Sequence, residues 1–325
     1  MEAVKNSILD FPQQLTYQPV VENAGKLVKK ERFTLIGMGG SRLAADLLRS
    51  ANPEIDLSIH ADYGLPRLPQ AVLENSFLIF CSYSGNTEEV LDGFEEALKA
   101  GLAVGVIAAG GKLIERAKET GVPYICLPDW QLVPRLAVGL MLKALVVLLD
   151  LQNLKQELET LTTKLTPAGL ESVGQDLAKS LEARVPIIYT SAANAPLAWI
   201  WKIKFNETAK VPAFANVLPE QNHNELEGFD SIPVNSGLSG QFSFVFLTDS
   251  SDNSRIKRRF EILNDILSKK GLPVTTLELK GESKWEKFFN SLTLSDWTTL
   301  ALAEHYQRDP ASVPLIEEFK KLMAN

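Results

Sequence analysis

The chain has 325 residues, 45% hydrophobic and 22% charged, a composition typical of a globular protein with room for two domains of roughly 150 residues each. Its formal net charge of −7 argues against nucleic acid or an anionic membrane surface as a partner. Any phosphate must therefore be bound by a local site. The two cysteines, Cys81 and Cys126, are too few for a disulfide framework, and both lie in apolar runs, so we expect both to be buried.

In the first half of the chain, short apolar runs alternate with amphipathic helical patterns. The expected strands are 33–36, 57–60, 77–80, 103–107 and 124–126, and the expected helices are 42–50, 88–99 and 113–119. This alternation predicts an α/β fold, in which a mainly parallel sheet is flanked by helices on both faces.

Residues 136–182 show a helical pattern with a break near Pro167. The apolar stretch 136–149 is interrupted by Lys143 and is shorter than the roughly 20 residues that cross a bilayer, so it predicts a buried helix. The N-terminus lacks the apolar core of a signal peptide. We therefore expect a cytoplasmic protein without a membrane partner.

A second α/β pattern follows. Its expected strands are 185–189, 243–247 and 274–278, and its expected helices are 196–206, 255–269 and 312–323. Pro196 suits the first turn of a helix, where a missing N–H costs no hydrogen bond, and Ser312 is expected as the N-cap of the last helix. The chain is thus predicted to form two domains, residues 1–153 and 154–325.

Two loops rich in small residues stand where an expected strand passes into an expected helix. They are residues 37–41 (GMGGS) and 82–87 (SYSGNT). Helix N-termini attract anions because their backbone N–H groups are unpaired. Hydroxyl donors are added by Ser41, Ser82, Ser84 and Thr87. The loops predict one phosphate held between them, and hence a phosphorylated small molecule as ligand.

The first loop has two other interpretations. It resembles the dinucleotide fingerprint G-x-G-x-x-G, with Asp62 at about the position of a ribose-binding acid, but Arg42 stands where the last glycine belongs. The other interpretation is a tight turn that binds nothing. The hydroxyl residues of the second loop favour the phosphate.

The second half contains a weak repeat of the second loop, because residues 243–253 resemble residues 76–86. Asp249 and Asp252 stand where the first copy has Ser82 and Gly85. Two carboxylates would repel a phosphate. We therefore expect only the first half to keep the anion site.

Several motifs together resemble one known family. They are residues 37–41, 82–88 and 110–113, the pair Pro134 and Arg135, and the blocks 206–214 (NETAKVPAF), 218–225 (LPEQNHNE) and 309–310 (DP). Through these motifs the chain resembles the sugar isomerase (SIS) domain proteins, most closely the bifunctional phosphoglucose/phosphomannose isomerase family. The resemblance covers nearly the whole chain. It implies two SIS-like domains and an isomerase that interconverts glucose 6-phosphate, and mannose 6-phosphate, with fructose 6-phosphate through an enediolate.

The resemblance also implies roles for individual residues. Glu207 would move a proton between C1 and C2, and Arg135 would stabilise the enediolate. His223 and Lys320 would open the sugar ring, although Lys321 lies beside Lys320 and only helical phase separates them. The 6-phosphate would be held by Gly40, Ser41, Ser82, Ser84 and Thr87. The family's histidine comes from the neighbouring subunit, which implies an obligatory homodimer with active sites at the interface.

The residue types suit this chemistry. A carboxylate placed over the C1–C2 bond can remove and return the proton, and a histidine has a pKa near the working pH. Arg135 precedes an apolar helix whose N-terminal dipole disfavours a cation, which suggests that its charge serves a ligand. The segment around His223 is not H-E-x-x-H, and the sequence has no Cys/His cluster. We therefore expect no metal and no cofactor.

Two other functions stay open on the sequence. A non-catalytic SIS regulator would bind a phosphosugar with the phosphate loops alone, and an isomerase of another phosphosugar would share the same site. Thr208 stands where the family more often has Asn, and residues 296–308 lack the usual glycine before Asp309. The preference between glucose and mannose is therefore not fixed.

Overall fold

The computed structural model describes residues 1–230 and 236–323. The chain divides into two compact units, an N-terminal unit formed by Asp10–Leu165 and a C-terminal unit formed by Met1–Leu9 and Thr166–Asn325. The predicted domains, residues 1–153 and 154–325, stay a prediction. None of the helices in the described residues combines the length and apolar character that a membrane span needs.

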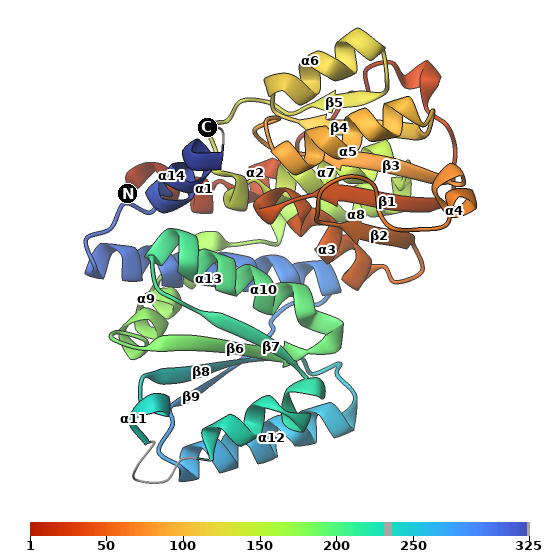
Figure 1. Cartoon of the computed structure of the whole chain (residues 1–325). Helices are drawn as coiled ribbons and strands as arrows, with labels where there is room; N and C mark the ends of the chain where they lie inside the picture. The colour runs from red at the N-terminus through yellow and green to blue at the C-terminus, as the bar shows by residue number, and fades with distance from the viewer. Residues whose placement is uncertain (231–235, 324–325) are drawn as a thin grey trace. The chain divides into compact units, whose positions relative to one another are not determined.

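The N-terminal unit is built on a five-stranded parallel sheet with the strand order β2-β1-β3-β4-β5 (Figure 1). The strands are β1 (Arg32–Gly37), β2 (Asp56–His60), β3 (Ser76–Cys81), β4 (Ala103–Ala108) and β5 (Tyr124–Cys126). The helices are α2 (Phe11–Gln14), α3 (Leu43–Ala51), α4 (Gln70–Glu74), α5 (Glu88–Lys99), α6 (Gly111–Thr120), α7 (Val138–Leu148) and α8 (Gln152–Thr160).

Strand β3 lies at the centre of this sheet, and all of its residues are buried. On one face, the ring of Phe80 meets the ring of Phe94 from α5 edge to face, with 5.2 Å between the centroids. On the other face, the ring of Phe77 occupies the space over Gly105, next to Leu148 of α7. Helices therefore cover both faces, as the alternating pattern predicts.

The C-terminal unit contains a four-stranded parallel sheet with the strand order β7-β6-β8-β9. The strands are β6 (Val185–Ser191), β7 (Phe214–Leu218), β8 (Phe242–Thr248) and β9 (Val274–Glu278). The helices in its described part are α1 (Glu2–Leu9), α9 (Glu171–Ser180), α10 (Ala195–Lys204), α11 (Ser236–Ser239), α12 (Ser254–Lys269), α13 (Lys284–His305) and α14 (Pro314–Met323).

The long helix α13 ties the C-terminal unit together. The indole of Trp297 donates a hydrogen bond to the carbonyl of Pro167 at 2.8 Å, which fixes the segment before α9. Lys204, at the end of α10, forms a nearly buried ion pair with Asp296 at 2.7 Å. Both ends of the α9–α10 region are therefore anchored to one helix.

The predicted α/β fold class is confirmed, and each predicted strand overlaps an observed strand. Several elements were not predicted, namely the short helices α1, α2, α4 and α11, the strand β7 and the long helix α13. Strand β7 lies at a sheet edge and is mostly half-buried, so it lacks the fully apolar run of a central strand. Helix α13 buries polar as well as apolar residues, which hides its helical period.

Three local predictions are wrong. Cys126 is exposed because it ends the edge strand β5, whereas Cys81 is buried as expected. Residues 136–182 form three α-helices with an additional break after α7, where Asp150 takes a left-handed φ of 56°. Helix α14 begins at Pro314, so Ser312 is not its N-cap.

Candidate functional site

The two small-residue loops meet at the carboxyl edge of the N-terminal sheet. Strands β1 and β3 are parallel neighbours, so their carboxyl ends lie side by side, with Gly37 paired to Cys81. The hydroxyl of Ser41 accepts a hydrogen bond from the backbone N–H of Tyr83 at 2.9 Å, which joins the two loops. The structure thus brings together the hydroxyl cradle, a name used here for Ser41, Ser82, Ser84 and Thr87.

The second loop of the cradle is held in a tight shape. Ser82 Oγ and Thr87 Oγ1 share a hydrogen bond of 2.8 Å, and the N–H of Gly85 donates to Ser82 Oγ at 3.1 Å. Gly85 has a left-handed φ of +69°, and a Cβ there would lie 1.7 Å from the carbonyl oxygen of Gly110. The loop therefore requires glycine at position 85.

Helix α5 starts directly after Thr87, whose side chain makes no cap hydrogen bond. The first N–H groups of a helix then remain available to an anion. Ser84 is exposed, Thr87 is half-buried, and Ser41 and Ser82 are buried. In the hydroxyl cradle, Ser84 and Thr87 are therefore accessible to a ligand, whereas Ser41 and Ser82 are held in place by burial.

Arg135 lies in a short 3₁₀ turn, Pro134–Leu136, just before α7, and only 2% of its surface is exposed. A Cβ on Gly40 would lie 3.0 Å from the backbone of both Pro134 and Arg135. Gly40 therefore allows the first loop to approach this turn. The structure brings Gly40 and the Arg135 backbone together, and burial argues against a surface salt bridge for this arginine.

Glu207 lies in a single π-helical turn, Phe205–Ala209, at the end of α10. The turn is held from both sides, because Lys210 donates to the carbonyl of Glu207 and the side chain of Asn206 accepts from the N–H of Ala213 at 2.9 Å. Isolated π turns often occur at functional sites. These hydrogen bonds thus fix the backbone position from which the Glu207 side chain extends.

The half-buried Glu207 lines a pocket of about 370 Å³ inside the C-terminal unit. The other lining residues are Asn206, Lys210, Val211, Pro212, Arg308, Val313, Pro314, Leu315 and Ile316. Arg308 was not proposed from the sequence, and its position just before the Asp309-Pro310 motif was the one available signal. The pocket places a carboxylate near cationic side chains.

The two residues predicted to open the ring occupy other places. His223 ends a 3₁₀ turn, Glu220–His223, and is exposed. Lys320 and Lys321 are both exposed on α14, so burial does not distinguish them. Neither His223 nor Lys320 is among the residues that line the Glu207 pocket. Within residues 1–230 and 236–323, no three His, Cys, Asp or Glu side chains gather in the way a metal site needs.

Two parallel-sheet units, one with a hydroxyl cradle at its carboxyl edge, define an α/β protein of the SIS-domain type. Residues 171–323 match the family model described as the bacterial phospho-glucose isomerase C-terminal SIS domain. The tagatose-6-phosphate ketose/aldose isomerase of Escherichia coli has a similar fold, with a TM-score of 0.69 and 16% identity over 95% of this chain and 94% of that one.

Curated relatives narrow the class. The chain is 32% identical to the bifunctional phosphoglucose/phosphomannose isomerase of Aquifex aeolicus, over 99% of this chain and 98% of the relative. It is 31% identical to the protein of the same name from Caldicellulosiruptor bescii, over 98% of each. The chain belongs to the bifunctional phosphoglucose/phosphomannose isomerase family.

Proposed function

We propose that this chain is a phosphohexose isomerase, which interconverts glucose 6-phosphate, and mannose 6-phosphate, with fructose 6-phosphate. The observation that carries the proposal is the hydroxyl cradle in a chain that belongs to this family along its whole length. A non-catalytic regulator would need the cradle but would have no use for a buried Arg135 or for Glu207 in a pocket.

The hydroxyl cradle binds the 6-phosphate. The hydroxyls of Ser41 and Ser84, and one of the hydrogen-bonded pair Ser82 and Thr87, donate to phosphate oxygens. The N-terminus of α5 adds backbone N–H groups and a favourable dipole. Gly40 keeps the first loop close enough to reach the same phosphate. This binding anchors one end of the open-chain sugar.

Glu207 acts as the base at the other end. It removes the proton from C2 of the aldose, so that the released electron pair forms the C1–C2 double bond of the enediolate. Return of that proton to C1, together with transfer of the O2 hydroxyl proton to O1, gives the ketose. Arg135 stabilises the negative charge on the oxygens between the two steps. Glucose 6-phosphate and mannose 6-phosphate differ only in configuration at C2, so both give the same enediolate.

His223 and Lys320 assist ring opening, in which one group protonates the ring oxygen while another accepts the proton of the C1 hydroxyl. The exposure of both residues supports the use of His223 from a second subunit. The active form in this proposal is a homodimer with sites at the interface, and it works in the cytoplasm without a metal or cofactor.

A coupled assay of the purified chain tests the proposal. Fructose 6-phosphate is supplied, and the formation of glucose 6-phosphate and of mannose 6-phosphate is followed with separate coupling enzymes. We expect turnover to both products, in the presence of EDTA as in its absence. Binding of phosphosugars without turnover would favour the regulator, and turnover to only one product would remove the second substrate.

A further inference from the structure

A chain of hydrogen bonds fixes the segment that carries His223 to the C-terminal sheet. The buried hydroxyl of Tyr189, on β6, donates to the carboxylate of Glu225 and accepts from the side-chain amide of Gln221 at 3.3 Å. Asn216, on β7, donates to the other carboxylate oxygen of Glu225 at 2.5 Å. The strands thus hold the segment on both sides of His223.

The state of the Tyr189 hydroxyl makes this arrangement durable. Burial, followed by the hydrogen bond to the Glu225 carboxylate, raises the pKa of Tyr189 well above its usual value. The hydroxyl therefore stays protonated at neutral pH and can donate to Glu225. Glu225, the last residue of the 218–225 motif, acts as an anchor for the segment.

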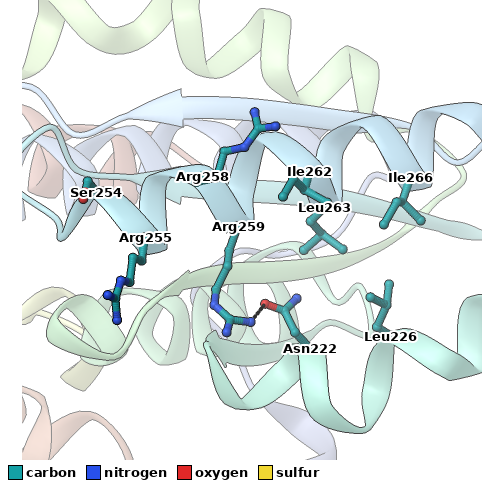
Figure 2. A pocket seen from close by; sticks show the side chains of 9 residues that line it. All are labelled: Asn222, Leu226, Ser254, Arg255, Arg258, Arg259, Ile262, Leu263 and Ile266. Carbon is teal, nitrogen blue, oxygen red and sulfur yellow. Dashed lines mark hydrogen bonds between the residues drawn. The ribbon is translucent and has the colours of Figure 1, made fainter.

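Helix α12 also holds this segment. Arg259 Nη1 donates to the side-chain oxygen of Asn222 at 3.1 Å (Figure 2). Asn222 in turn donates to the side-chain oxygen of Gln221 at 2.7 Å. Asn222 directly precedes His223 in the chain. Arg259 is thus hydrogen-bonded to the side chain of the residue that directly precedes the histidine.

Arg259 and the preceding Arg258 have different partners. Arg258 is paired with Glu261 on the surface of α12 at 2.9 Å, whereas within the part of the chain that the structure describes Arg259 forms no ion pair. Both arginines line the same open groove of about 620 Å³ between α12 and the segment (Figure 2). The guanidinium of Arg259 is therefore directed at Asn222.

We propose that Arg259 is a positioning residue for His223, and that it acts through Asn222. This inference rests on the ring-opening role given to His223 in the proposed function. His223 is exposed, so little packing orients its imidazole, and its direction follows from the backbone on either side. The clamp formed by Arg259, Asn222 and Gln221 fixes that backbone on one side.

Hydrogen–deuterium exchange tests the hold on the segment without using activity. Arg259→Met removes the guanidinium and keeps most of the aliphatic stem, and Arg258→Met is the matched control. We expect exchange in peptides covering residues 219–225 to rise at least about threefold in Arg259→Met, because local opening becomes easier. The control should match the wild type. Equal exchange in the two variants would overturn the proposal.

Kinetics test the consequence for catalysis. In Arg259→Met we expect kcat to fall about tenfold while KM changes less than twofold, since misplacing a catalytic group affects turnover more than binding. Arg259→Lys should recover part of the loss, and Asn222→Ala, which removes the same hydrogen bond from its other end, should reproduce it.

A double-mutant cycle separates this inference from the proposed function. If Arg259 acts through His223, the double variant His223→Ala with Arg259→Met should be no slower than His223→Ala alone. Losses that multiply would overturn the inference. If His223→Ala alone turned over normally, the role of His223 would fail and so would the catalytic part of the inference, while the exchange result would still decide whether Arg259 holds the segment.

Discussion

In each unit the strand order reverses between two neighbouring central strands, β1 and β3 in the N-terminal unit and β6 and β8 in the C-terminal unit. Loops that follow such strands meet at one edge, where open α/β sheets bind ligands. In the N-terminal unit this edge carries the hydroxyl cradle. In the C-terminal unit it carries Asp249, which is buried and paired with Lys287 at 2.6 Å.

The C-terminal edge therefore contains its own anion. Burial pushes the pKa of Asp249 up, but hydrogen bonds from Lys287 and Ser251 outweigh burial and hold that pKa at about 2. Ser191 is engaged in the same way, because its hydroxyl donates to Asp252 at 2.7 Å. The difference supports the expectation that only the first half binds phosphate. In the proposed function, the loops of the N-terminal edge bind phosphate with their available donors. At the C-terminal edge the chain supplies the acceptors itself, and Asp249, Asp252, Lys287 and Ser191 form a structural cluster.

The largest expected effect tests whether Glu207 is the base while the hydroxyl cradle binds the phosphate. Glu207→Gln should lower kcat about 10³-fold, because an amide cannot accept the carbon-bound proton. Phosphosugar affinity, measured by calorimetry, should change little, since the hydroxyl cradle is untouched. Glu261→Gln, at an exposed carboxylate, is the control. Normal turnover in Glu207→Gln would remove the assigned base.

The next test concerns the cluster around Asp249 in the C-terminal unit. Asp249→Asn should lower the free energy of unfolding by about 3 kcal/mol, because it leaves the mostly buried Lys287 without its charge partner. Glu278→Gln breaks the exposed pair with Lys280 and should cost less than about 1 kcal/mol. Urea unfolding measures both. If Asp249→Asn instead lost phosphosugar binding while its unfolding free energy stayed unchanged, the cluster would be a ligand site. The contrast drawn between the two sheet edges would then be wrong.

A smaller effect is expected in the hydroxyl cradle. Ser84→Ala combined with Thr87→Ala should raise KM about tenfold and leave kcat nearly unchanged, because phosphate contacts act equally on bound substrate and transition state. Thr120→Ala, which removes an exposed hydroxyl at the end of α6, is the matched control. Steady-state kinetics on fructose 6-phosphate decide the matter, and an unchanged KM would argue against the anion site.

The sequence predicted the central strands well because each is a short apolar run that ends at small or polar residues. It did not predict α13, whose polar residues face the interior. Thr298 and Thr299 donate to the carbonyls of Leu294 and Ser295 one turn earlier, so burial leaves them satisfied. A helix that buries polar and apolar residues alike shows no clear amphipathic period. Its identity depends on the surrounding packing.

The candidate site divides in a similar way. The hydroxyl cradle was predictable because all of its residues lie in two short loops that follow adjacent strands. The π turn that holds Glu207, and the approach of Arg308 to the same pocket, depend on contacts between segments far apart in the sequence. The clamp from Arg259 to Asn222 is of the same kind. Local spacing encodes residues within one loop, whereas partners from different elements require the fold.

The smallest expected effect is a pH dependence that marks Asp249 as an internal anion. The pKa of Asp249 is about 2 in the folded protein and 3.8 in an unfolded chain. The ionised Asp249, paired with Lys287, therefore stabilises the protein above about pH 4, and this contribution is lost as the pH falls toward 2. The difference in unfolding free energy between wild type and Asp249→Asn should therefore shrink by about 1 kcal/mol between pH 5 and pH 3. Because the other carboxylates are common to both proteins, the difference isolates this one. A constant difference would mean that Asp249 titrates normally, and the contrast between the two sheet edges would then be one of shape rather than charge.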